Sequence, residues 1–119
     1  MATTKETLPK LMDIEGCVGT CIVDSNSGMM LGSAGTGVDL EVAAAGNTEV
    51  VRAKRKTMKA LNLNEQIEDI LITLGKQYHL IRPLKNKPTL FFYVALDRTR
   101  ANLAMARFSL SDVEKDIVL

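Results

Sequence analysis

The sequence predicts an α+β domain with the element order α-β-β-α-β-β-β-α and a five-stranded antiparallel sheet. The first observation is a stretch with helical periodicity, residues 38–61, which separates a β-hairpin from three further strands. The second is that these strands are joined by short polar turns, whereas parallel strands need long crossover connections. We therefore expect one sheet with a long helix between its second and third strands.

Length, composition and charge limit the possible functions. A chain of 119 residues (13.0 kDa) fits a single domain, residues 1–119, with its own core. A net charge of +1 gives no reason to expect a nucleic-acid partner. The longest apolar run, Leu90–Leu96, is too short to span a membrane, and the N-terminal residues hold no secretory signal. We expect a cytoplasmic protein without nucleic-acid or membrane partners, with residues 1–6 disordered.

The first elements are expected to be a short helix and a hairpin. Apolar residues at helical spacing, with Pro9 in the first turn, predict a helix at about 7–14. Segments rich in β-formers at 17–23 and 29–33 flank the turn residues 24–28. This pattern is typical of a β-hairpin that opens directly after the helix.

The long helix is expected to span residues 38–61, with Thr36 and Asp39 in a capping box at its start. One face is unusually thin, because three alanines at 43–45 stand beside Gly46. A glycine inside a helix costs about 1 kcal/mol relative to alanine. We therefore expect another helix to pack closely against this face.

The second half predicts three strands and a helix. Residues 67–75 alternate well between two faces. Residues 78–84 form the next strand, which Pro83 closes. Residues 90–96 are apolar enough for a central strand buried on both faces. Asp97 is expected to cap a final amphipathic helix that contains Leu103–Ile117.

The sequence predicts no active site, metal site or cofactor. Cys17 and Cys21, four residues apart on one strand, should point to the same face, too far apart for a disulfide, and are interpreted as small buried hydrophobes. With one histidine, His79, they do not complete a zinc site. The glycines at 32–37 lack the spacing of a phosphate-binding loop and are interpreted as a structural turn. A distant enzyme hypothesis would depend on His79 or Asp97.

A basic stretch lies in the second half of the long helix. Arg52, Arg55, Lys56 and Lys59 share one side of that helix, at steps of three and four residues. The simpler interpretation is that these four side chains only form a solvent-exposed face of the helix. The functional one is a partner-binding patch for an acidic protein, since no aromatic residues are interleaved for nucleic-acid binding.

The strand at 67–75 is a candidate sheet edge, because no proline or inward lysine blocks pairing at 70–74. Pairing with a second copy is therefore expected, with the two long helices packed together. The predicted homodimer interface consists of Ala43, Ala44, Asn47, Val51, Ile67, Asp69, Ile70, Leu71, Ile72, Thr73 and Leu74.

Three stretches resemble the roadblock family, small domains first known as dynein light chains. They are GCVGTCIVDSNSGMMLGSAG (16–35), IEDILITLGKQYHLIRPL (67–84) and LFFYVALDRTRANLAMARFSL (90–110). The resemblance extends from about Leu8 to Ile117, in order and in length. A single domain without extensions is most similar to the stand-alone bacterial members.

The resemblance implies a regulator without an active site of its own. Roadblock domains form homodimers or heterodimers, in which the sheets join across the strand after the long helix. They act as platforms or GTPase-activating partners for small Ras-like GTPases, and bacterial relatives regulate a GTPase of polarity and motility. The family carries no catalytic residue over to this chain. The implied partners are a second copy and a small Ras-like GTPase.

Two other functions stay open. The chain is alternatively a structural assembly module that binds other roadblock-type or motor-complex subunits without nucleotide dependence. The second alternative is a small-ligand sensor, in which the small residues Ala43, Ala44 and Gly46 leave a pocket between the helix and the sheet.

Overall fold

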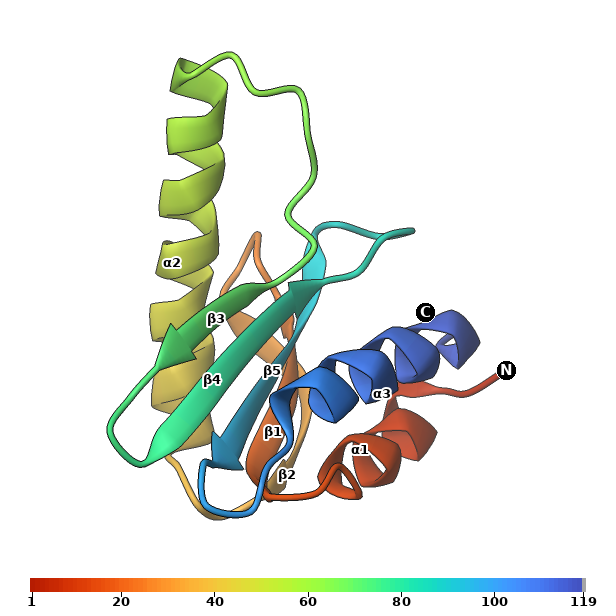
Figure 1. Cartoon of the computed structure of the whole chain (residues 1–119). Coiled ribbons are helices and arrows are strands. Elements are labelled where there is room, and N and C mark those ends of the chain that lie inside the picture. Colours follow the sequence, from red (N-terminus) through yellow and green to blue (C-terminus); the bar gives the residue numbers. More distant parts are fainter. Residues whose placement is uncertain (119) are drawn as a thin grey trace.

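The structure of the chain, a computed structural model, describes residues 1–118 and confirms the predicted fold class and element order (Figure 1). The elements are α1 (Thr4–Met12), β1 (Cys17–Asp24), β2 (Met29–Gly35), α2 (Leu40–Ala60), β3 (Ile70–Thr73), β4 (Gln77–Pro83), β5 (Leu90–Asp97) and α3 (Leu103–Asp116). All strand pairs are antiparallel, in the order β2-β1-β5-β4-β3. The apolar strand β5 is central as predicted, and β2 and β3 are the edges.

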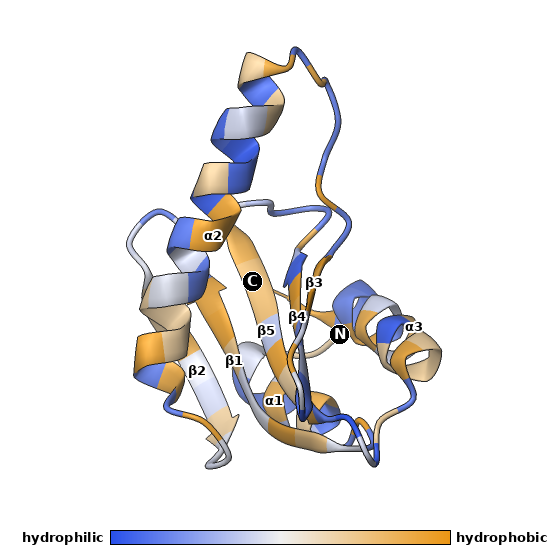
Figure 2. Ribbon diagram, turned by 60° about the vertical axis from the view of Figure 1, so that its left-hand side comes forward, coloured by the Kyte–Doolittle hydropathy of each residue, from blue (hydrophilic) through white to orange (hydrophobic). Residues whose placement is uncertain are grey.

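Helices cover both faces of the sheet, with α2 on one side and α1 and α3 on the other (Figures 1 and 2). Successive side chains of β5 point to opposite faces of the sheet, so they contribute to two separate cores. Phe92 belongs to the core under α1 and α3, whereas Phe91 and Tyr93 belong to the core under α2. The apolar residues of β1 and β5 therefore lie between the helical layers (Figure 2).

The strand β3 is shorter than predicted, because it begins at Ile70 rather than at residue 67. Ile70 pairs with Ile81, so the residues before it would have to pair toward Pro83, which has no backbone N–H. Asp69 instead binds Arg107 of α3, with a distance of 3.0 Å between Oδ2 and Nε. Residues 61–69 form a connection from α2, in which Asn62 has a φ of 58°.

Three helix starts differ from the sequence-based expectation. Residues 4–6, within the stretch expected to be disordered, form the first turn of α1, whose capping box pairs Thr3 with Glu6. Thr36 does not cap α2, because the Asp39 side chain alone accepts the Val42 N–H. The predicted capping role of Asp97 was also wrong.

Asp97 ends β5 several residues before α3 begins. Its Oδ1 accepts hydrogen bonds from the backbone N–H and the hydroxyl of Thr99, which closes a turn. These bonds lower the pKa of the Asp97 carboxyl. Asn102 caps α3 instead, by accepting the Met105 N–H.

The two cysteines are free and buried, as predicted, but they face different cores. Cys17 lies in the core under α1 and α3, and Cys21 lies under α2. The expectation that they share a face was wrong because the register of β1 against β5 shifts between Cys17 and Gly19. Burial raises the pKa of the Cys21 thiol to about 12.

None of the helices in the described part of the chain is long and apolar enough to cross a membrane.

Glu114 joins α3 to the end of β4. Its carboxylate accepts from Arg82 Nε at 2.6 Å and from the backbone N–H of Lys85, and its side chain is only 11% exposed. Replacing it (Glu114→Ala) should lower the free energy of unfolding by about 2–3 kcal/mol, because a largely buried guanidinium loses its partner.

Glu49→Ala is the matched control, since the Glu49 side chain is 74% exposed in its pair with Arg52. It should change stability by less than about 0.5 kcal/mol. Urea denaturation of both variants tests this difference, and equal effects would contradict the role given to Glu114.

Candidate functional site

The face of the sheet under α2 is covered unevenly. α2 packs mainly against β1 and β2, at one side of the sheet (Figure 2). At the other side, Ile70 and Ile72 of β3 are only partly buried, and so is His79 of β4, which is directly opposite Ile72. We call Ile70, Ile72 and His79 the open sheet face. It adjoins the unpaired edge of β3.

His79 makes the polar contacts of this face. Its Nε2 lies 2.8 Å from Gln77 Oε1, and its Nδ1 lies 3.2 Å from the Tyr93 hydroxyl. These distances fit a neutral imidazole that donates to Gln77 and accepts from Tyr93. Burial lowers the pKa of His79 and raises that of Tyr93 to about 12, so both groups are held uncharged.

The helix residues of the predicted dimer interface divide into two sets. Ala44 and Val51 are fully buried against the sheet within one chain, so they leave no surface for a second copy. Ala43 and Asn47 are half-buried on the flank of α2. Gly46 is exposed, and within the described residues nothing lies within 4 Å of where a Cβ would stand.

The strand residues of the predicted interface also divide. Thr73 and Leu74 are exposed at the β3 edge. Leu71 packs toward the core under α1 and α3, on the opposite face from the isoleucines, as the alternation predicted. Ile67 lies before β3 in the connection from α2, and Asp69 is bound by Arg107.

The structure places the four basic residues predicted for partner binding in two different settings. Arg52 donates from Nε to the Ser25 carbonyl at 2.9 Å and also reaches the Asn26 carbonyl, so it fixes the β1–β2 turn. Arg55 donates to the Pro88 carbonyl and to the Ser25 hydroxyl, so it fixes the β4–β5 turn. Of the four, only Lys56 and Lys59 are both exposed and make no side-chain hydrogen bond or salt bridge within the described residues.

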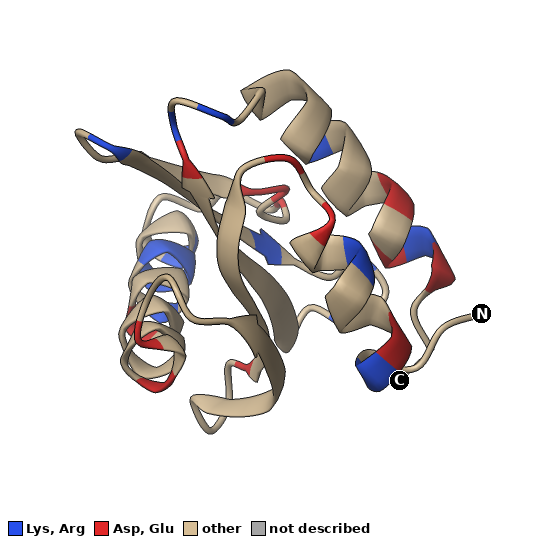
Figure 3. Cartoon of the chain, turned by 90° about the horizontal axis from the view of Figure 1, so that it is seen from below, with Lys and Arg blue, Asp and Glu red and all other residues tan. Residues whose placement is uncertain are grey.

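The sequence gives no signal for the bracing role of the two arginines. Their acceptors are mostly backbone carbonyls, which every residue has, and they lie 26 to 33 residues away in the chain. Seen from below, Lys and Arg gather on one part of α2 and acidic residues lie on another part of it, and α1 and α3 also carry both charge signs (Figure 3).

The residues of the enzyme hypothesis are not brought together by their contacts. Asp97 bonds with Thr99, whereas His79 bonds with Gln77 and Tyr93. Within residues 1–118, no three His, Cys, Asp or Glu side chains are grouped so that they could hold a metal ion. The glycine-rich turn includes Gly35, whose φ of 86° requires a glycine.

No protein-family model matches the sequence, and no curated protein matches it. Solved structures do match the fold. Myxococcus xanthus MglB has a TM-score of 0.81 at 18% identity, covering 94% of this chain and 89% of that one. A Roadblock/LC7 domain from Streptomyces avermitilis has a TM-score of 0.78 at 11% identity, covering 92% and 89%. M. xanthus MglC has a TM-score of 0.61 at 16% identity, covering 93% and 92%.

These likenesses show that the chain has the roadblock fold, with the element order and the long helix that the sequence predicted.

His79 should make stability depend on pH. Because burial lowers its pKa in the folded chain, the unfolded chain binds the proton first as pH falls. Stability should therefore fall as pH drops below about 6.5, the ordinary histidine value, and level off once the folded form also binds a proton.

Urea denaturation between pH 7.5 and 5 tests this expectation in the wild type and in His79→Gln, which keeps a polar side chain of similar reach. The variant should lose the part of the pH dependence that lies near pH 6. A wild type and a variant with parallel curves would show that His79 does not control it.

Proposed function

We propose that this chain is a non-enzymatic, dimeric regulator or scaffold of a small Ras-like GTPase, as its resemblance to roadblock domains implies. The single observation that supports the dimer most strongly is the unpaired β3 edge beside the open sheet face. An exposed strand edge with free backbone groups and no charged residue is a template for pairing.

The dimer that fits these surfaces joins two β3 strands, residues Ile70–Thr73, in one continuous sheet. Each open sheet face then adjoins the seam, where the partner's α2 covers its isoleucines. Small residues on α2 allow two helices to approach closely, and Ala43, Gly46 and Asn47 remain accessible for that contact. Ala44 and Val51 are no longer part of the proposed interface, since they belong to the core.

The GTPase-binding surface is proposed on the exposed side of α2, with Lys56 and Lys59 as its cations. Arg52 and Arg55 contribute indirectly, because they hold the neighbouring turns in place. The alternative function, an assembly module for other roadblock-type subunits, uses the same surfaces. It differs in having no dependence on the nucleotide.

A lysine on the open sheet face should break the dimer. In Ile72→Lys, a charge would have to be buried at the seam, which should weaken dimerisation by roughly 100-fold or more. Light scattering during size-exclusion chromatography measures the effect, and circular dichroism confirms that the variant is folded.

Leu31→Lys is the matched control, since Leu31 is 49% exposed on β2, the opposite edge of the sheet. It should leave the dimer intact. A wild type that is monomeric at every concentration would contradict the proposed dimer. Loss of the dimer in both variants would contradict the assignment of the interface to β3.

The GTPase partner should bind in a nucleotide-dependent manner. Immobilised protein is incubated with source-cell lysate that contains either a non-hydrolysable GTP analogue or GDP. A small Ras-like GTPase should be enriched only with the analogue, and Lys56→Glu with Lys59→Glu should reduce the enrichment, because two attractive charges become repulsive.

Lys5→Glu with Lys10→Glu, on the exposed surface of α1, controls for net charge. Equal recovery of partners with both nucleotides would favour the assembly module instead. Recovery unaffected by the α2 substitutions would move the binding surface elsewhere.

A further inference from the structure

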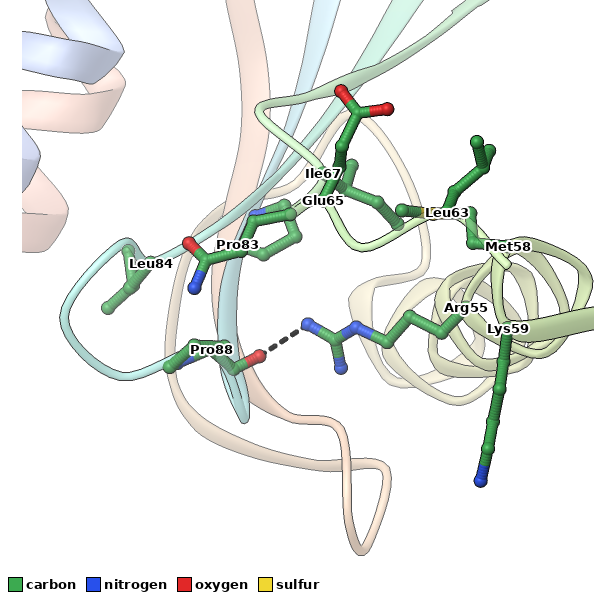
Figure 4. Close-up of a pocket in the computed structure, with 10 residues that line it drawn as sticks. Arg55, Met58, Lys59, Leu63, Glu65, Ile67, Pro83, Leu84 and Pro88 are labelled. Atoms are coloured by element: carbon green, nitrogen blue, oxygen red, sulfur yellow. Dashed lines mark hydrogen bonds between the residues drawn. The ribbon is translucent and has the colours of Figure 1, made fainter. Parts of the chain in front are cut away.

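A cavity of about 270 Å³ opens where the C-terminal half of α2 leaves the sheet (Figure 4). One wall comes from α2 and the connection that follows it, and the other from the end of β4 and the β4–β5 turn. Most of the lining residues are apolar. These apolar residues are Met58, Leu63, Ile67, Pro83, Leu84 and Pro88. The volume lies below the range typical of small-molecule sites, so the cavity suits one or two side chains.

The Arg55 guanidinium lies across the cavity from α2 toward Pro88 (Figure 4). It uses one N–H on the Pro88 carbonyl and one on the Ser25 hydroxyl. A guanidinium has five N–H donors, so three of those on Arg55 find no acceptor in the described chain. No carboxylate of residues 1–118 forms a salt bridge with Arg55 or Lys59.

The charges around the cavity favour an acidic ligand. Lys59 lines the cavity one helical turn after Arg55, with its ammonium pointing away from the opposite wall (Figure 4), and Lys87 lies in the turn that carries Pro88. Glu65 is the one acidic residue of the lining, and its carboxylate points away from Arg55 (Figure 4). A cation with unused donors beside an apolar wall is complementary to a carboxylate that is attached to an apolar group.

We propose that this cavity is a docking site for an acidic peptide segment of a partner protein. An apolar side chain of the peptide enters between Met58 and Pro83, and a neighbouring carboxylate accepts hydrogen bonds from Arg55. The site shares Lys59 with the proposed GTPase-binding surface, but it goes beyond the proposed function because it needs neither the β3 edge nor a nucleotide. Of its lining residues, Ile67 belongs to the predicted dimer interface, and Arg55 and Lys59 belong to the predicted partner-binding patch.

The experiment uses a fluorescein-labelled six-residue peptide of alternating leucine and glutamate, titrated with the full chain and followed by fluorescence anisotropy. A peptide of alternating leucine and lysine is the control for charge. The acidic peptide should bind saturably, and raising the salt concentration should weaken it. Equal binding of the basic peptide would overturn the proposal.

Three variants locate the binding. Arg55→Gln should weaken it about tenfold, the effect of losing charge-assisted hydrogen bonds. Met58→Glu should abolish binding, because it places a negative charge in the apolar wall, and it does not touch the bonds that brace the turns. Lys54→Gln, on an exposed position of the same helix, should leave the affinity unchanged.

Each variant is also examined by light scattering, so that failure of the peptide site is distinguished from failure of the dimer. Unchanged affinity in a folded Met58→Glu variant would overturn the site. Competition by free glutamate as strong as by the peptide would also overturn it, since a small acid alone would then explain the binding.

Discussion

The central strand β5 is apolar on both faces, and the rest of the structure depends on the need to cover it. Five strands spaced about 4.8 Å apart span about 19 Å between the outer strand axes, whereas one helix with its side chains is about 10 Å wide. Two helices, α1 and α3, cover one face, but α2 alone covers the other. Because α2 lies over β1 and β2, the part of this face that is formed by β3 is left only partly covered. A second copy supplies the missing helix in the proposed dimer.

The same helix also produces the second surface. α2 is longer than the sheet beneath it, so its C-terminal half extends past the strand ends (Figure 1). Arg52 and Arg55 fix that half by donating to carbonyls of the β1–β2 and β4–β5 turns. The space between the helix, its connection to β3 and the second of these turns is the cavity that Arg55 spans. One long element thus contributes both to the proposed dimer, at one flank, and to the proposed docking site, near its end.

The fold followed from the sequence because its signals are local. Alternation located the strands, and the double-sided apolar run 90–96 correctly placed β5 at the centre. The errors came from contacts between distant segments. Pro83 shortened β3 through its missing N–H, and a register shift separated Cys17 from Cys21. The partner-binding patch stays a prediction, but the sequence could not show that Arg52 and Arg55 bind backbone carbonyls of distant turns, because every residue has a carbonyl. Helical phase alone would have separated Ala44 and Val51, which face the core, from Ala43 and Asn47 on the flank.

Hydrogen exchange of the β3 amides tests the central claim most directly, because it reports on the sheet edge without any substitution. The backbone N–H groups of Ile70–Thr73 that point away from β4 have no partner among residues 1–118 of a single chain. If a second β3 pairs with them, their exchange should slow as protein concentration rises through the dimerisation range, while the β2 edge exchanges at a constant rate. Exchange at β3 that is fast and independent of concentration, in a sample shown to be dimeric, would contradict the account.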